Sequence, residues 1–415
     1  MSKVKLKEIG LFKNGLNFSA DRVAKGCKMI GIPDFGDRYF ADLSNLSEID
    51  NTIVPDECTL KDGDILFVRS NGNKALVGRT MIIKEISERI TFSGFCIRFR
   101  PNSEIAIPLY LLLLFKSPVF RKRFSNTQQT SINNINQEVL GEIEIDLPSK
   151  DEQQKIINCI FPIIRKIEIN NAVNDNLQQQ LKLMYDYWFN QFDFPNEDGK
   201  PYRASGGKMR YSHRLKRDIP EGWTEESVIS NSISAPIKPG VEPFSTKIYL
   251  ATADVSGTRL SAGSLIDYET REGRANMQPT VSSVWFAKMK NSIKHLFLNR
   301  EMNQLIDSTI LSTGFCGLQC TDKSFEYIAA FIEHSYFEDI KNILAHGATQ
   351  ESVNNDDLLG LAMLVPTSEV LEMFHAKAKP LYAQISQNIC ENQKLTEIRD
   401  WLLPMLMNGQ ATISD

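Results

Sequence analysis

The chain has 415 residues, of which 42% are hydrophobic and 24% charged, with 47 lysines and arginines against 51 aspartates and glutamates. This length predicts two to four domains, each large enough to bury its own core. The formal net charge of -4 excludes a chain that is basic throughout. Because lysine and arginine drive binding to phosphates, any contact with nucleic acid would need local patches or partner proteins.

Two features bear on the cellular compartment. The longest apolar run, residues 109–115, is too short to span a bilayer, and the first ten residues lack the apolar core of a signal peptide. The seven cysteines are scattered, as expected for reduced thiols. We therefore expect a cytoplasmic protein. Cys316 and Cys320 alone are close, and without further ligands nearby they are better explained as buried thiols than as a zinc site.

Residues 1–148 predict a mixed α/β unit with short strands. Two apolar runs within residues 64–83 flank Asn71-Gly72, a sequence typical of a tight hairpin turn. Further strands are expected at residues 93–100 and 142–147. Between them, residues 107–124 predict a helix that is broken at Ser117-Pro118, since the residue before a proline disfavours the α conformation.

A long helix is predicted over residues 149–189. Ser149 and Glu152 have the spacing of a capping box at its start. Pro162 lies well inside the pattern, where we expect a kink or break that costs roughly 3 kcal/mol if nothing compensates. The seam positions follow each other at alternating spacings of four and three, as in a coiled coil. They are Ile156, Ile160, Ile163, Ile167, Asn170, Asn174, Leu177, Leu181, Met184 and Trp188.

The same pattern returns over residues 367–408, which are followed by a short tail, residues 409–415. Pro380 here corresponds to Pro162, and Arg399 interrupts the apolar seam where the first helix has Leu181. Each seam is too long to be buried on its own globule, so we predict that the two helices pack on each other. The seam positions are Phe374, Ala378, Leu381, Ile385, Asn388, Asn392, Leu395, Arg399, Leu402 and Leu406.

We favour antiparallel pairing because it places the middle of one helix against the middle of the other. Polar residues inside a seam lower stability but fix the register. The residues that would do so are Asn170, Asn174, Asn388 and Asn392. An alternative interpretation is that these asparagines lie at a wetter edge of the pair.

Residues 190–222 have the proline, glycine and serine content of a linker. The stretch is also basic, which leaves two interpretations: a solvated connector, or a contact with phosphates or an acidic partner surface. The basic residues are Lys200, Arg203, Lys208, Arg210, Arg214, Lys216 and Arg217.

Residues 223–366 loosely repeat the first unit. The sequence SGFC at 93–96 returns as TGFC at 313–316, TSIN at 130–133 as ESVN at 351–354, and Leu147-Pro148 as Val365-Pro366. Such spacing indicates an internal duplication. The predicted fold class is therefore α+β, with two pseudo-symmetric α/β units joined by two long helices that form an intramolecular antiparallel coiled coil.

Catalytic motifs are missing from the sequence. It contains no Gly-rich phosphate loop, no nucleophile elbow and no HExxH motif, and its five histidines are isolated. We therefore expect neither an enzyme nor a chain that binds a metal or cofactor itself.

Several segments resemble the specificity subunits of type I restriction-modification systems. They are the hairpin DILFVRSNGNKALVGR, the run QQTSINNINQEVLGEIEIDLPSKDEQQKI, the junction DYWFNQFDFPNEDGKPYRASGGKM and LTEIRDWLLPMLMNGQ near the C-terminus. The resemblance covers essentially the whole chain, although the second unit departs most, because it lacks the Asn-Gly turn.

The resemblance implies a role in host defence. Residues 1–148 and 223–366 would be target-recognition domains, each reading one half of an asymmetric bipartite site in double-stranded DNA, with the helices as spacer. Catalysis would lie elsewhere: two modification subunits would transfer a methyl group from S-adenosylmethionine to adenine. Restriction subunits would add ATP-driven translocation and cleavage. The alternative function is a scaffold or adaptor that bridges partner subunits without reading DNA.

Side chains that read base edges or hold phosphates are expected on two loops of the first unit. The alternative interpretations are that Asn71 is present for the turn and that Arg98 and Arg100 are solvated residues alternating out of a strand. The candidates are Arg69, Asn71, Asn73, Lys74 and Arg79 on the hairpin, and Gln128, Gln129, Thr130, Ser131 and Asn133 on a polar loop.

The second unit is acidic. Residues 223–366 hold 11 lysines and arginines against 17 aspartates and glutamates, compared with 20 against 18 in residues 1–148. Aligning VWFAKMKNS with ILFVRSNGN places Lys288 opposite Arg69 and Lys290 opposite Asn71. The candidates here are Arg271, Arg274, Asn276 and Gln278 on one loop, and Lys288, Lys290, Lys294 and His295 on another.

Overall fold

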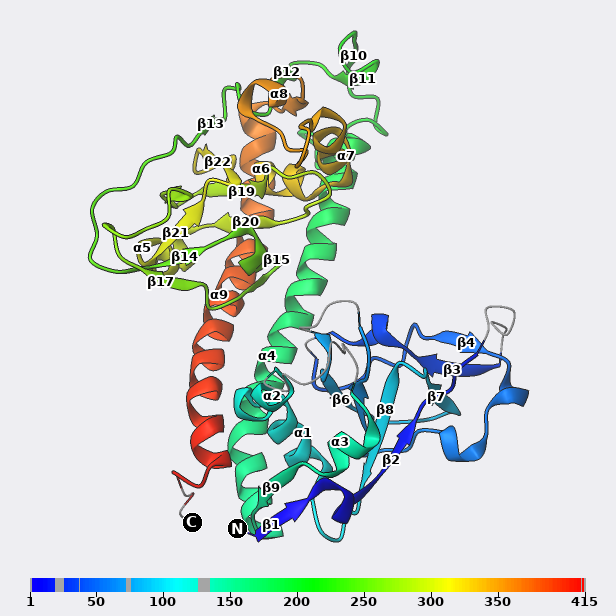
Figure 1. Cartoon of the computed structure of the whole chain (residues 1–415). Coiled ribbons are helices and arrows are strands. Elements are labelled where there is room, and N and C mark those ends of the chain that lie inside the picture. Colours follow the sequence, from blue (N-terminus) through cyan, green and yellow to red (C-terminus); the bar gives the residue numbers. More distant parts are fainter. Residues whose placement is uncertain are drawn as a thin grey trace. The chain divides into compact units, whose positions relative to one another are not determined.

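A computed structural model describes residues 2–18, 26–36, 38–71, 76–125, 135–411 and 413, with residues 122–125 as backbone only (Figure 1). The chain forms two compact units, Met1–Ile164 with Glu397–Asp415, and Arg165–Thr396. Each unit contains one α/β head together with parts of two long helices. We call the part from β1 to β9 the first head and the part from β12 to β23 the second head.

Two sheets form the first head, beside a short pair of strands, β1 (Ser2–Lys5) and β9 (Glu144–Leu147). The four-stranded sheet has the order β2 (Gly10–Asn14), β8 (Cys96–Pro101), β5 (Ile65–Val68), β6 (Thr80–Ile82), and all its strands are antiparallel. The three-stranded sheet has the order β4 (Ser47–Ile49), β3 (Cys27–Ile30), β7 (Ile90–Phe92), with β3 and β7 parallel. The helices are α1 (Pro108–Lys116), α2 (Pro118–Ser125) and α3 (Gln137–Gly141).

Strand β5 is buried along its whole length because both of its faces are covered. Ile65 and Phe67 belong to one core and Leu66 and Val68 to another, as expected for side chains that alternate across a sheet. Phe67 packs on Phe115 of α1 with ring centroids 5.1 Å apart. The four-stranded sheet of the first head thus lies between two cores, and α1 covers one of them.

Most sequence predictions for the first head are confirmed. Helix α1 ends and α2 begins at Ser117-Pro118, where Ser117 is extended (ψ 144). The predicted pairing of the two apolar runs is confirmed, because β5 and β6 are antiparallel and the N–H of Val68 donates to the carbonyl of Arg79 (2.9 Å) beyond them. The predicted turn at Asn71-Gly72 includes Gly72, which lies outside the described residues.

The second head repeats this arrangement. Its short pair is β12 (Thr224–Ser227) with β23 (Ala362–Val365). One sheet has the order β13 (Ser234–Pro236), β22 (Phe315–Cys320), β19 (Ser283–Ala287), β20 (His295–Leu298). The other has the order β17 (Ser264–Ile266), β14 (Lys247–Leu250), β21 (Thr309–Ser312), β18 (Ala275–Met277), with β14 and β21 parallel. The remaining elements are β15 (Val255–Ser256), β16 (Arg259–Leu260), α5 (Asn303–Ser308), α6 (Phe325–Glu333), α7 (Ser335–Leu344) and α8 (Asn355–Leu358).

The duplication is therefore visible in the strand order, but one predicted equivalence is wrong. The side chain of Asn136 caps α3 and that of Asn354 caps α8, each accepting from an N–H three residues later. Asn136 corresponds to Asn354, which shifts the expected match of TSIN with ESVN by three residues. The constant spacing of the long helices thus begins before them, in the heads.

The first long helix, α4 (Lys150–Tyr185), continues into a π-helical turn, Asp186–Asn190. Its capping box is confirmed, because the N–H of Ser149 donates to Glu152 (2.9 Å) and the N–H of Glu152 to Ser149 Oγ (3.3 Å). The helix is continuous through Pro162, so of the two predicted alternatives, a kink or a break, the break is wrong. Pro162 is exposed, whereas its neighbours Ile160 and Ile164 are buried in the core of the first unit, which holds the helix together.

The second long helix, α9 (Ser368–Met407), runs antiparallel to α4, as predicted. In the second unit Asn170 Nδ2 donates to Asn392 Oδ1 (2.9 Å), and Asn388 Nδ2 donates to Asn174 Oδ1 (2.8 Å). An advance of four residues on α4 therefore corresponds to a return of four on α9. Asn170 and Asn174 are buried, so the alternative of a wet edge is excluded for them.

Residues 190–222 are folded, and a simple solvated connector is not what the structure shows. Phe192 and Phe194 are buried against Trp223, with ring centroids 5.6 and 5.4 Å away. The guanidinium of Arg217 lies 4.9 Å from the Phe192 ring. The segment also contains the hairpin of β10 (Met209–Ser212) and β11 (Arg217–Pro220). Aromatic burial thus attaches it to the second unit.

Among the described helices, none combines the length and apolar character needed to cross a membrane.

Candidate nucleic-acid interface

Arg69 lies immediately after β5, where three segments of the first head meet. Its N–H donates to the carbonyl of Phe95 in the turn between β7 and β8 (2.8 Å). Its own carbonyl accepts from the N–H of Ile135 (2.9 Å), the residue that follows the predicted polar loop. The backbone of Arg69 is therefore held on both sides, and the described ends of the two predicted loops come together there.

Lys288 has the same position in the second head. Its N–H donates to the carbonyl of Gly314 in the turn between β21 and β22 (2.9 Å), and its carbonyl accepts from the N–H of Val353 (3.0 Å). Val353 precedes the cap Asn354, just as Ile135 precedes the cap Asn136. Both heads thus hold one basic residue at the end of the central strand by the same two backbone hydrogen bonds.

The other candidates of the first head are less completely described. Asn71 and Arg79 are half-buried, and the carbonyl of Arg79 closes the base of the loop. Several candidates lie outside the described residues: Asn73, Lys74, Gln128, Gln129, Thr130, Ser131 and Asn133.

Arg98 and Arg100 have structural roles, which corrects their interpretation as solvated residues. Arg98 is buried and donates to the carbonyls of Glu57 (2.9 Å) and Thr59 (3.0 Å). Arg100 forms a two-pronged ion pair with Asp64, with both N–O distances 2.7 Å. The hydrogen bonds to Asp64 raise the pKa of Arg100, against the effect of burial. These arginines bind β8 to neighbouring segments.

The turn between β21 and β22 brings the two candidate loops of the second head together. The carbonyl of Arg274 accepts from the N–H of Thr313 (2.9 Å), and the next residue, Gly314, accepts from Lys288. Arg274 is exposed, whereas the guanidinium of Arg271 lies 3.8 Å from the Tyr268 ring. Basic side chains from both loops therefore belong to one region of the head.

The remaining candidates of the second head differ in how far their side chains are exposed and free to contact DNA. Lys290 forms an ion pair with Glu351 (2.8 Å), which offsets its charge. Asn276 and Gln278 are half-buried at β18, and Lys294 is half-buried at the end of the loop. His295 is buried and lies 2.9 Å from a carboxylate oxygen of Glu338, so it is not a surface residue.

Sequence reasoning missed Lys341 and Asn342 of α7, whose side chains form hydrogen bonds with the backbone of the loop between β19 and β20. Lys341 Nζ donates to the carbonyls of Ala287 (3.0 Å) and Ser292 (3.1 Å). Asn342 Oδ1 accepts from the N–H of Asn291 (2.8 Å). The available signal was a lysine four residues after Phe337 and three before Leu344, a spacing that places all three on one face of a helix.

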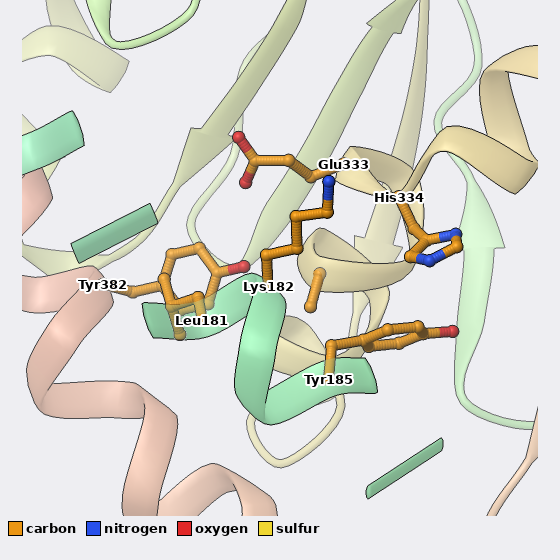
Figure 2. A pocket seen from close by; sticks show the side chains of 7 residues that line it. Leu181, Lys182, Tyr185, Glu333, His334 and Tyr382 are labelled. Carbon is orange, nitrogen blue, oxygen red and sulfur yellow. The ribbon is translucent and has the colours of Figure 1, made fainter. Parts of the chain in front are cut away.

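A pocket of the second unit lies away from these loops, where α4, α6 and α9 meet (Figure 2). Glu333 accepts from Gln178 Nε2 (2.6 Å), and Figure 2 shows Lys182 of α4 extending toward it. Burial raises the pKa of Glu333 to about 7, although Gln178 and Lys182 act in the other direction. His334 Nε2 lies 3.1 Å from a carboxylate oxygen of Asp186.

The described part of the chain holds no group of three or more histidine, cysteine or acidic side chains arranged for a metal ion. Cys316 and Cys320 are both buried, and burial raises the pKa of Cys316 to about 12. Neither thiol has the low pKa of a metal-binding or nucleophilic cysteine.

The structure therefore defines a protein with two related α/β heads and two antiparallel helices. Each head has one basic residue, Arg69 or Lys288, whose backbone is fixed by two hydrogen bonds. Comparisons with known proteins place this arrangement among specificity subunits of restriction enzymes. A family model described as type I restriction modification DNA specificity domain matches residues 1–179. The specificity subunit of the type I restriction enzyme HindI from Haemophilus influenzae is 21% identical over 85% of this chain and 87% of the relative.

Further relatives agree. The specificity subunit of the type I restriction enzyme MjaIX from Methanocaldococcus jannaschii is 24% identical over 86% of this chain and 81% of its own. The crystal structure of a type I restriction-modification system S subunit from M. genitalium covers the whole chain with a TM-score of 0.51 at 13% identity, which shows the shared fold. The chain is thus similar to type I restriction enzyme specificity subunits over most of its length, and its residues 1–179 match the model of their DNA specificity domain.

Proposed function

We propose that this chain is the sequence-specific DNA-binding subunit of a type I restriction-modification complex. Each head would read one half of an asymmetric bipartite site, and α4 with α9 would set the length of the unspecified spacer. The observation that carries this proposal is the equivalence of Arg69 and Lys288, each held at its backbone by a turn and by the segment before a short capped helix. Arginine and lysine are the side chains that most often read guanine in the major groove.

The surroundings of the two residues differ, which suits two unlike half-sites. The first head carries 20 basic residues against 18 acidic ones, and the second 11 against 17. An acidic head binds DNA weakly by itself, because phosphate contacts supply much of the affinity. Two modification subunits would therefore complete the DNA clamp and carry out adenine methylation with S-adenosylmethionine. Restriction subunits would supply the ATP-dependent steps, so this chain would need no cofactor of its own.

The spacer role is supported by the hydrogen-bonded asparagines of the helix pair. Asn170 contacts both Asn392 and Glu391, and Lys166 pairs with Glu391 at 3.2 Å. A helix pair with a single register has a defined length, which a ruler requires.

The test is to coexpress the chain with its modification subunits and to map methylated adenines in the host DNA. We expect one bipartite motif. Arg69→Ala should make one half of this motif degenerate and Lys288→Ala the other. Arg38→Ala and Arg300→Ala are matched controls, because each removes a solvent-exposed arginine of an ion pair from the corresponding unit. A scaffold or adaptor predicts that neither half changes, and methylation without a bipartite motif would refute the proposal.

A further inference from the structure

The loop of residues 288–294, between β19 and β20, is anchored by Lys341, a buried charged residue of α7. The side chain of Lys341 is fully buried, and its ammonium has three partners. It donates to the carbonyl of Ala287 at the end of β19 (3.0 Å), to the carbonyl of Ser292 within the loop (3.1 Å), and to Glu338 Oε1 (2.9 Å). All three donors of the ammonium are thus used.

Burying the ion pair of Lys341 and Glu338 costs desolvation free energy, so the need to fill the core does not by itself explain the pair. Replacing a buried ion pair by apolar side chains of similar volume is often neutral or stabilising. Glu338 Oε1 also lies 2.9 Å from His295 Nε2, at the start of β20. The cluster of Glu338, Lys341 and His295 therefore connects α7 to both ends of the loop.

Asn342, the next residue of α7, completes the attachment. Its Oδ1 accepts from the N–H of Asn291 (2.8 Å), which has a left-handed backbone conformation with φ 57. At its two ends the loop is held by Gly314 and Val353, through Lys288, and by Ala287, whose N–H donates to the carbonyl of Lys294 (2.9 Å). The backbone that carries Lys288, Lys290 and Lys294 is thereby fixed before any ligand binds.

We propose that Lys341 is a positioning residue for sequence discrimination by the second head. It sets the backbone of residues 288–294 so that the lysines of this loop meet base edges in one fixed arrangement. The inference rests on the proposed function, since it concerns the same loop. A reading group held within a fraction of an ångström discriminates better than a mobile one, because less ordering has to occur on binding.

The test uses the double variant Glu338→Gln with Lys341→Met in the complex with the modification subunits. Removing both charges together avoids an unpaired buried carboxylate, so the head should fold, which thermal unfolding checks. The readout is the methylation rate on a cognate duplex divided by the rate on duplexes with one mismatch. We expect discrimination in the half-site that Lys288→Ala affects to fall about tenfold, the equivalent of 1.4 kcal/mol, and discrimination in the other half-site to stay unchanged.

Ile343→Ala is the matched control, because Ile343 lies on the same helix and is 75% exposed. It should leave both half-sites unchanged. If the double variant folds and discriminates like the wild type while Lys288→Ala does not, the positioning role is refuted and the proposed function stands. If the wild-type complex has no bipartite motif, the proposed function itself fails. Equal losses in both half-sites would also refute the inference, since they would indicate a general effect on stability.

Discussion

Asn388 of α9 donates a hydrogen bond from Nδ2 to Oδ1 of Asn174 on α4, over 2.8 Å, inside the seam of the two helices. Asn174 is completely buried and Asn388 is 5% exposed. This hydrogen bond forms in one register only, because a shift of either helix moves the two amides apart. The pair thus selects the register at some loss of stability.

Asn388→Leu should destabilise the second unit by about 1–3 kcal/mol, since it leaves the amide of Asn174 without its partner. The double variant Asn174→Leu with Asn388→Leu should recover most of this loss, because two leucines pack well in a seam. Urea unfolding followed by circular dichroism measures both changes. Asn176→Ala, at an exposed position of α4, is the control. A double variant less stable than Asn388→Leu would contradict the account.

The helix pair can be lengthened at matched positions. One heptad inserted into both α4 and α9, beside Asn174 and Asn388, adds about 10 Å, or roughly three base pairs of spacer. Methylation mapping should show an extended gap with both half-sites unchanged. An insertion into one helix alone mismatches the seam and should abolish the motif. Changed half-sites after the matched insertion would show that the helices do more than set a distance.

The ion pair of Arg100 and Asp64 should contribute strongly to the first head. Asp64 is 1% exposed, so Arg100→Ala leaves a buried carboxylate without its main partner. Breaking a buried pair in this way costs about 3–5 kcal/mol. Lys13→Ala, which removes a surface pair with Glu57, should change stability by less than about 1 kcal/mol. Thermal unfolding distinguishes the two, and equal effects would contradict the structural role of Arg100.

The stability of the second unit should fall as the pH rises through the range set by Glu333. Its pKa is raised from 4.5 to about 7, so the folded state binds a proton that the unfolded state has already lost. The resulting stabilisation is present below pH 4.5 and is lost toward pH 7, with a size on the order of 2 kcal/mol for a half-buried group. Glu333→Gln should flatten this part of the pH profile. An unchanged slope in the variant would refute the assignment to Glu333.

The local pattern of the sequence was enough to predict the helices and their pairing. A spacing of four and three residues, with two asparagines repeated in register, specifies a seam and its centre without any knowledge of the heads. The break at Ser117-Pro118 and the capping box of Ser149 and Glu152 depend on neighbouring residues only. The continuity of α4 through Pro162 does not, because the burial of Ile160 and Ile164 in a core outweighs the lost hydrogen bond.

The sequence by itself therefore determined the duplication, the two long helices, their antiparallel pairing and the equivalent positions of Arg69 and Lys288, each directly after a strand. The tertiary structure decided which charged residues belong to the interior. The sequence does not distinguish Arg98, His295 and Lys341 from exposed charged residues. In the structure they are buried, and carbonyls and carboxylates from distant segments surround them. Periodicity is a property of the chain, whereas the burial of a charge depends on partners that only folding brings to it.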